Sequence, residues 1–285
     1  MRMLLAAIET PLDHNKFLAS RSKKELLSFV IAINKSCTAR RRLHDDDHHR
    51  HDPLVDVLKK IKDRVASKAC SATTGAVIDR GHRERFGNKS FRDLHAWLPS
   101  LVASLGIESE AEAEEVGGYL QASFGDAQRL DYGTGHETAF VLFLYCLFRI
   151  RAVPESRLGD CSLVTVLREY FECCRAIQTT YNLEPAGSRG VWALDDYQCL
   201  SFLFGSAQHC GGNSAESFGD KRDDLLSASL EYAGKSQSPI LASLKGKTWR
   251  QINTQILLYY ETQVLGKFVV ARHILFGTIF KATWK

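Results

Sequence analysis

The sequence lacks an uninterrupted apolar stretch long enough to cross a bilayer. The longest such run extends from Ala139 to Phe148, whereas a membrane-spanning helix needs about 20 apolar residues. A short apolar patch occupies the first eight residues, but Glu9 and Asp13 follow before the hydrophobic segment of a cleaved leader develops. We therefore expect a soluble intracellular protein without a membrane partner.

The sequence also lacks the usual signatures of self-contained catalysis. Its eight cysteines show no metal-ligand spacing, which favours buried, reduced thiols. There is no serine or cysteine in a nucleophile elbow, no pair of metal-binding histidines on a helix and no lysine of the Walker type after a glycine loop. These absences argue against a hydrolase that assembles its own nucleophile and base.

Positive charge is too sparse and too scattered to indicate nucleic-acid binding. The formal net charge is only +4, and part of it lies in the cluster Arg40-Arg41-Arg42. No stripe of alternating basic and aromatic residues is present. We expect no nucleic-acid partner.

Proline is rare, with six in 285 residues, and long stretches follow the 3.6-residue period of an amphipathic helix. Alternating apolar and polar runs joined by hairpin turns are missing, so no substantial sheet is expected. The pattern predicts an all-α fold, a single multi-helix domain. The expected helices are 14–35, 53–69, 88–104, 110–123, 136–152, 162–181, 195–209, 220–233 and 248–265.

The segment 38–52 is rich in histidine, aspartate and arginine. Its composition allows a metal-binding hypothesis, but such ligands would have to be ordered against a large loss of conformational entropy. We interpret 38–52 as a disordered, solvated loop.

The most informative stretch is Arg-Leu-Asp-Tyr-Gly-Thr-Gly-His-Glu at 129–137, directly before the longest apolar run. Thr134 and Glu137 have the spacing of a capping box, in which each side chain hydrogen-bonds a backbone N–H at the start of a helix. The remaining N–H groups of a helix start attract anions, above all phosphate, and Arg129 could add a bidentate contact. The stretch predicts a phosphate-binding turn, although a turn satisfied by its own cap explains the pattern equally simply.

A second polar stretch at 184–198 contains Gly187, Gly190 and the pair Asp195-Asp196. Asp195 and Gln198 again have capping-box spacing, which leaves Asp196 in the first helical turn. Asp196 is either a magnesium ligand or a carboxylate that stabilises the positive end of the helix. The residues alone leave both interpretations open.

The stretch at 129–137 closely resembles the signature of the phosphotyrosyl phosphatase activator family, whose members activate type 2A protein phosphatases and are also described as peptidyl-prolyl isomerases. The resemblance covers roughly residues 8–280. Four further segments agree with the family in the same order: 85–89, 187–196, 202–208 and 265–268, the last leading to His273 and Phe276-Gly277.

The resemblance implies a fold with core, linker and lid lobes around a deep cleft that binds ATP with Mg²⁺. Carried over by motif position, the nucleotide contacts would be Arg129, Thr134, Gly135, Gly190, Val270 and His273, and Asp196 would be the magnesium ligand. It also implies a cytoplasmic location, with the nucleus as a second one.

The function implied by the resemblance is activation of a type 2A phosphatase through its catalytic subunit, with the scaffold subunit as a further partner. The first alternative is a peptidyl-prolyl cis-trans isomerase that binds proline-containing peptides in the same cleft, and the second is a helical scaffold without activity. Segment 233–240 lacks the Phe and the acidic residue usual in the family, which keeps the scaffold alternative open. Ala193 and Val269 also stand where the family usually has Gly and Pro.

Overall fold

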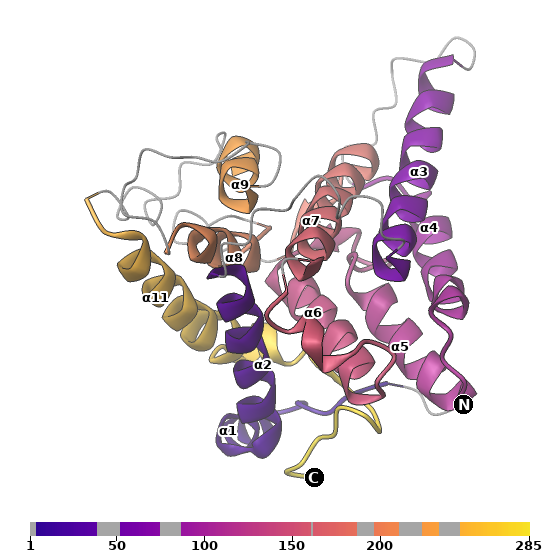
Figure 1. Ribbon diagram of the computed structural model, residues 1–285. Helices are drawn as coiled ribbons and strands as arrows, with labels where there is room; N and C mark the ends of the chain where they lie inside the picture. The colour runs from indigo at the N-terminus through magenta and orange to yellow at the C-terminus, as the bar shows by residue number, and fades with distance from the viewer. Residues whose placement is uncertain are drawn as a thin grey trace.

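The computed structural model describes residues 4–38, 52–74, 87–160, 162–186, 197–210, 224–233 and 246–285, and these are mainly helical (Figure 1). The longer α-helices are α1 (Pro11–Ala19), α2 (Arg21–Thr38), α3 (Pro53–Thr74), α4 (Phe91–Trp97), α5 (Glu110–Ala122), α6 (Thr134–Arg149), α7 (Ser162–Tyr181), α8 (Leu200–His209), α9 (Leu225–Ala233) and α11 (Trp249–Tyr259). Shorter or non-α helical segments are η2 (Leu98–Leu105), η3 (Glu155–Arg157), η6 (Tyr260–Leu265) and α12 (Phe268–Ala271).

Extended structure is limited to two pairs of two-residue strands within the described residues. β1 (Leu5–Ala6) pairs antiparallel with β4 (Leu275–Phe276), and β2 (Asp131–Tyr132) pairs parallel with β3 (Glu184–Pro185). The all-α prediction is therefore confirmed. Across this part of the chain, no helix is both long enough and apolar enough to span a membrane.

Three of the expected helices are divided in the structure, and one of them, 248–265, is α11 followed by the π-helix η6. The expected helix 14–35 is α1 and α2, because Ser20 adopts an extended conformation that ends α1, and its Oγ then accepts a hydrogen bond from the N–H of Lys23 in α2. The expected helix 88–104 is α4 followed by the 3₁₀ helix η2. Pro99 lies in the first turn of η2 and has no N–H for an α-helical hydrogen bond.

The other helix predictions agree with the structure to within a few residues, where it describes them. The expected helix 195–209 is observed as Leu200–His209, and residues 195–196 lie outside the described residues. The same holds for 220–223 of the expected helix 220–233, and for 39–51 of the segment 38–52. The prediction that 38–52 is a disordered loop thus stays untested.

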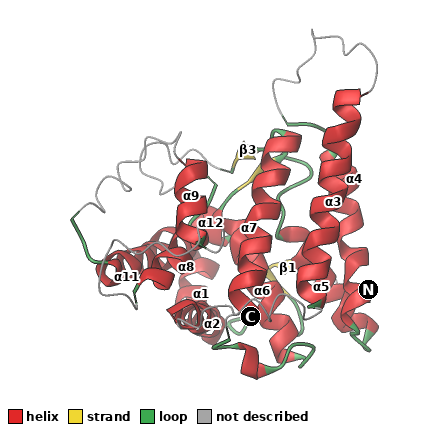
Figure 2. Cartoon of the chain, turned by 45° about the horizontal axis from the view of Figure 1, so that its top comes forward, coloured by secondary structure: helices red, strands yellow, loops and turns green. Residues whose placement is uncertain are grey.

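Helix α6 lies at the centre of the molecule. In both views α8, α9 and α11 lie on one side of α6 and α7, and α3, α4 and α5 lie on the other (Figures 1 and 2). Its residues from Phe140 to Phe148 are all buried, and the ring of Phe140 stacks on Tyr170 of α7 at a centroid distance of 3.6 Å. Each large apolar side chain buried in this way contributes about 1.5–3 kcal/mol, so this helix anchors the core.

A buried carboxylate joins α6 to α8. Glu137, in the first turn of α6, is fully buried, and its Oε2 accepts hydrogen bonds from the N–H groups of Cys199 at 2.8 Å and Leu200 at 3.0 Å. These N–H groups begin α8 and have no partner within their own helix. Glu137 therefore caps a distant helix, and the positive end of the α8 dipole stabilises its charge.

A second buried carboxylate holds the C-terminal segment. Glu115 of α5 accepts hydrogen bonds from the backbone N–H groups of Thr278, Ile279 and Phe280 and from the Thr278 hydroxyl. A side chain at Gly277 would collide with this carboxylate, since a Cβ there would lie 2.3 Å from the Glu115 carboxyl carbon. The contact fixes the path of the chain just beyond α12 and β4.

The contact between Glu137 and α8 generates a stability prediction. We expect Glu137→Gln to lower the free energy of unfolding by about 1–3 kcal/mol, because two charge-assisted hydrogen bonds become neutral ones. Glu137→Ala should lower it further, since the N–H groups of Cys199 and Leu200 would then lose their acceptor. Urea denaturation followed by circular dichroism measures both changes.

Glu114→Gln is the matched control, because Glu114 lies on the exposed face of α5 and surface substitutions change stability by at most about 0.5 kcal/mol. Equal stabilities of Glu137→Gln and Glu114→Gln would contradict the assigned role of Glu137.

Candidate functional site

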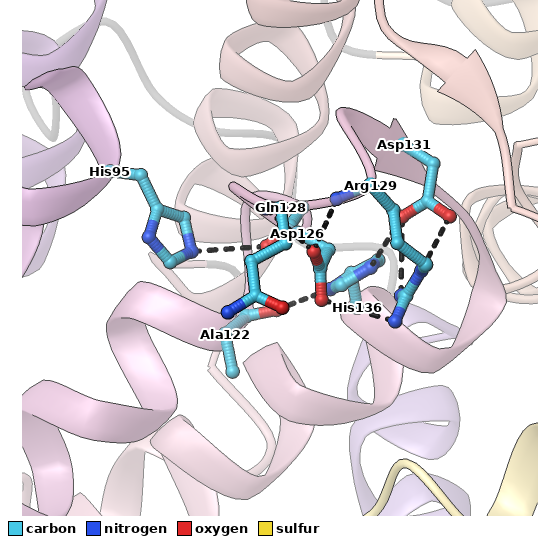
Figure 3. Close-up of polar contacts among 8 residues, drawn as sticks. His95, Ala122, Asp126, Gln128, Arg129, Asp131 and His136 are labelled. Carbon is cyan, nitrogen blue, oxygen red and sulfur yellow. Dashed lines mark hydrogen bonds and ion pairs between the residues drawn. The ribbon is translucent and has the colours of Figure 1, made fainter. Parts of the chain in front are cut away.

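A tight turn between α5 and α6 presents Arg129 (Figure 3). Asp126 Oδ1 accepts hydrogen bonds from the N–H groups of Gln128 and Arg129, each at 2.8 Å. Leu130 then adopts a left-handed conformation with φ of 55°, and the N–H of Asp126 donates to the Asp131 carbonyl at 3.0 Å. The turn is therefore closed on itself, and its direction is set by Asp126.

The guanidinium of Arg129 is paired with two carboxylates of the same turn. Its Nε lies 2.8 Å from Asp131 Oδ2, and its Nη1 lies 3.1 Å from Asp126 Oδ2. The hydrogen bond with Asp131 raises the pKa of Arg129. The side chain is still 45% exposed, so it can reach an anion, but it would share its charge between that anion and the two aspartates.

His136 joins the turn from the first turn of α6. Its Nδ1 lies 2.7 Å from the carbonyl oxygen of Ala122, and this nitrogen therefore carries the proton and donates. Its Nε2 lies 3.9 Å from Asp131 Oδ1. Burial would raise the pKa of Asp131, but the nearby His136 and Arg129 outweigh it and hold that pKa below its usual value. Sequence reasoning singled out neither Asp126 nor Asp131, although a carboxylate directly after Gly125 is typical of a turn that binds its own backbone.

The start of α6 differs from the predicted capping box. Gly133 precedes the helix in an extended conformation, Thr134 is the first helical residue, and no side chain caps this end. The predicted exchange between Thr134 and Glu137 is wrong, because Glu137 turns to α8 instead. Tertiary contact has overridden the local pattern.

Some of the backbone N–H groups at the start of α6 therefore lack a hydrogen-bond acceptor among the described residues. The N–H of His136 donates to the Gly133 carbonyl at 2.9 Å, so His136 is not a free donor. Among the described residues, neither the N–H of Thr134 nor that of Gly135 has an acceptor, as expected for the first positions of a helix without a cap. A Cβ added at Gly135 would meet no atom of the described residues within 4 Å. The described part of the chain therefore leaves room beside Gly135.

The second polar stretch begins directly beside this turn. β3 pairs with β2, and the N–H of Ala186 donates to the Tyr132 carbonyl at 2.7 Å. A Cβ at Gly133 would lie 2.8 Å from the Cβ of Ala186, so only glycine permits this approach. The two residues that the sequence predicted here, Gly190 and Asp196, lie outside the described residues. Their roles, and that of the pair Asp195–Gln198 as a capping box, stay predictions.

The C-terminal part of the predicted site comes from α12 and the residues after it. α12 packs against α1 and α6, and Val270 lies half-buried against the core. Burial, followed by the positive charges of Arg129 and Arg272, lowers the pKa of His273. His273 therefore lies within range of the charges of the turn. The structure places Arg129, Thr134 and Gly135 at the turn, and Val270 and His273 in and just after α12, which packs against α6.

The donor set suits a phosphate better than a metal ion. Backbone N–H groups at a helix start, beside an arginine, bind anions. Among the described residues, no group of three or more histidine, cysteine, aspartate or glutamate side chains is placed to hold a metal.

Comparison with known proteins identifies relatives of this chain. The family model described as phosphotyrosyl phosphate activator (PTPA) protein matches residues 5–282. The serine/threonine-protein phosphatase 2A activator 2 of Yarrowia lipolytica is 32% identical over 96% of this chain and 81% of its own length. The serine/threonine-protein phosphatase 2A activator of Drosophila melanogaster is 34% identical over 69% of this chain and 54% of its own length.

The chain belongs to the phosphotyrosyl phosphatase activator family. Its fold agrees with a crystal structure of the PP2A phosphatase activator Ypa1 PTPA1, with a TM-score of 0.75 and 24% sequence identity over 98% of this chain and 95% of that one. The family resemblance inferred from the motifs is confirmed. The lobes and the cleft that it implied, and the single-domain boundaries, stay predictions.

The charges around the turn of this activator-family protein generate a pH prediction. Because the pKa of Asp131 is lower in the folded than in the unfolded chain, its ionised form stabilises the fold above the unfolded value of about 3.9, and this contribution is lost as the pH falls through the folded value. Asp131→Asn should therefore reduce stability at neutral pH by about 1–3 kcal/mol. The difference from the unaltered protein should shrink under acidic conditions, as urea denaturation at neutral and acidic pH will measure.

Asp93→Asn serves as the control for this measurement, because Asp93 is exposed on α4. If the deficit of Asp131→Asn stayed constant from neutral to acidic pH, the ionised Asp131 would not be the stabilising species.

Proposed function

We propose that this protein activates type 2A serine/threonine protein phosphatases by binding their catalytic subunit, with ATP and Mg²⁺ held at the turn before α6. The relatives named as phosphatase 2A activators support the partner. The nucleotide is supported by one observation in particular. The N–H groups of Thr134 and Gly135 have no acceptor among the described residues, and no atom of those residues lies within 4 Å of a Cβ added at Gly135.

Each residue of the proposed site has its own role in binding ATP and magnesium. The N–H groups of Thr134 and Gly135 hold phosphate oxygens at the positive end of the α6 dipole. Arg129 supplies charge from the side, shared with Asp126 and Asp131. His273, whose pKa is lowered by burial, flanks the base or ribose together with Val270. Magnesium, when bound, neutralises the phosphates, and Asp196 is the ligand that the sequence offers for it.

The mechanism is conformational, since the proposed site binds and orients and has no step of bond formation. ATP favours the arrangement of the activator that fits the phosphatase, and this arrangement promotes the active state of the phosphatase. Such coupling is reciprocal: if ATP strengthens binding of the phosphatase by a given factor, the phosphatase strengthens binding of ATP by the same factor. The scaffold subunit of the phosphatase is a further candidate partner.

Gly135→Ala tests the nucleotide site without harming the fold. The new methyl group has room, and alanine is a better helix former than glycine by up to about 1 kcal/mol, so thermal stability should be retained or rise. The methyl group would nevertheless occupy the space of the phosphate. We expect the affinity for ATP with Mg²⁺ to fall by about tenfold or more, equal to about 1.4 kcal/mol, in isothermal titration.

Thr134→Val is the matched comparison, because it keeps both backbone N–H groups and the size of the side chain. It should retain more affinity than Gly135→Ala. Unchanged ATP binding in a folded Gly135→Ala protein would remove the observation on which the proposed site depends.

Stimulation of the phosphatase tests the partner and the coupling. The activator should stimulate a purified type 2A catalytic subunit in the presence of ATP and Mg²⁺. Gly135→Ala should shift the ATP concentration for half-maximal stimulation upward by the same factor as its loss of affinity, and saturating ATP should restore the maximum. Stimulation that is independent of ATP would contradict the coupling but not the choice of partner.

A further inference from the structure

Helix α7 carries an arginine that lies partly inside the protein and has no ion pair among the described residues. Arg175 forms no ion pair with any carboxylate of the described residues, and its Nη1 is buried without a hydrogen-bond acceptor. Burial lowers the pKa of Arg175, and the charge of Glu172, one helical turn away, offsets this effect only in part. A guanidinium in such surroundings is costly unless it binds an anion.

Other charged residues of the same helix show the usual arrangement. Glu169 and Glu172 of α7 both pair with Lys62 of α3, at 2.8 Å and 2.6 Å. Arg168 pairs with Glu169 at 3.6 Å. Arg175 is thus an exception on a helix whose charges are otherwise balanced by ion pairs.

A second donor without an acceptor lies one helical turn further on. Gln178 is 3% exposed, and its Oε1 accepts a hydrogen bond from the Tyr232 hydroxyl of α9 at 2.7 Å. This contact fixes the orientation of the amide, so that its Nε2 is the atom left without a partner. Residues three apart on a helix lie on the same face. Arg175 and Gln178 therefore present two donors on one face of α7.

Aromatic side chains border this face, and Arg175 itself is only partly buried. Tyr232 lies half-buried, and its ring centroid is 6.3 Å from that of Tyr197. The hydroxyl of Tyr197 donates to the Leu183 carbonyl at 3.0 Å just beyond the end of α7. The face is thus bordered by α7, by Tyr197 and by α9.

The chemistry of the two atoms without hydrogen-bond partners determines the kind of ligand. Both atoms without partners are donors, and one of them carries a positive charge, which excludes a cation and disfavours a neutral acceptor. A planar guanidinium with an adjacent amide N–H matches the geometry of an oxyanion. We propose that Arg175 and Gln178 form a second oxyanion site, specific for a phosphate group and separate from the turn at Thr134 and Gly135.

The phosphate comes either as free inorganic phosphate or as part of a small phosphorylated molecule. The site does not depend on the function proposed above, because it uses none of the residues assigned to the nucleotide. It predicts that the protein responds to phosphate even when the start of α6 is blocked.

The test follows the side-chain amide resonance of Gln178 by nuclear magnetic resonance of the full chain, assigned by its loss in Gln178→Leu. Adding inorganic phosphate should shift this resonance, in both the unaltered protein and Gly135→Ala. Arg175→Gln should weaken the response by about tenfold or more. Arg168→Gln is the matched control, since it removes a paired arginine from the same helix. Sodium chloride at equal ionic strength separates specific binding from general screening.

Thermal unfolding gives an independent readout. Without phosphate, Arg175→Met should leave the melting temperature unchanged or raise it, because a buried guanidinium without a partner is replaced by an apolar chain of similar length. Phosphate should stabilise the unaltered protein and Gly135→Ala but not Arg175→Met.

The proposal is overturned if phosphate fails to shift the Gln178 resonance, or if it shifts that resonance equally in Arg175→Gln. It is also overturned if Gly135→Ala abolishes the shift. Repeating the titration with adenosine monophosphate in place of inorganic phosphate then shows whether the site takes free phosphate alone or also a small phosphorylated molecule.

Discussion

The fold depends on one carboxylate that serves a helix other than its own. Glu137 begins α6, yet its Oε2 accepts the first N–H groups of α8 from inside the core. A fully buried charge is tolerated only where donors surround it, and the positive end of α8 supplies them. Because this contact joins the central helix to α8, against which α2, α9 and α11 pack, it fixes the position of the whole side of the molecule that α8 organises.

The same contact explains why the start of α6 is open. A glutamate three residues after a threonine would ordinarily hydrogen-bond the start of its own helix. Glu137 instead binds α8, and the residue before α6 is Gly133, which has no side chain to cap the helix. The N–H groups of Thr134 and Gly135 therefore have no acceptor among the described residues. Glu115 uses the same principle when it gathers three consecutive N–H groups of the C-terminal segment.

The helical class and most helix positions could be predicted because the apolar period records which face of each helix is buried. The failures share a physical reason. The break between α1 and α2 lies at Ser20, whose Oγ hydrogen-bonds both neighbouring helices. The apolar period of the sequence continues across Ser20 and therefore does not reveal the break. The capping box between Thr134 and Glu137 was plausible from local spacing, but Glu137 accepts a hydrogen bond from Cys199, 62 residues away, instead. Pairing of Arg129 with Asp126 and Asp131 likewise depends on how the turn closes, which the order of residues does not reveal.

The two arginines show how differently the same side chain is used. Arg129 is neutralised by two aspartates of its own turn, so a phosphate bound at the start of α6 must compete with them for its charge. Most of the binding energy there must come from the backbone N–H groups, which the helix orients and which no mutation of a side chain removes. Arg175 is only partly buried, but its buried Nη1 has no hydrogen-bond acceptor and the guanidinium has no ion pair among the described residues, so an anion that reaches it meets less competition for its charge. The first arrangement suits a nucleotide whose phosphates also bind magnesium, while the second suits a phosphate bound through protein groups alone.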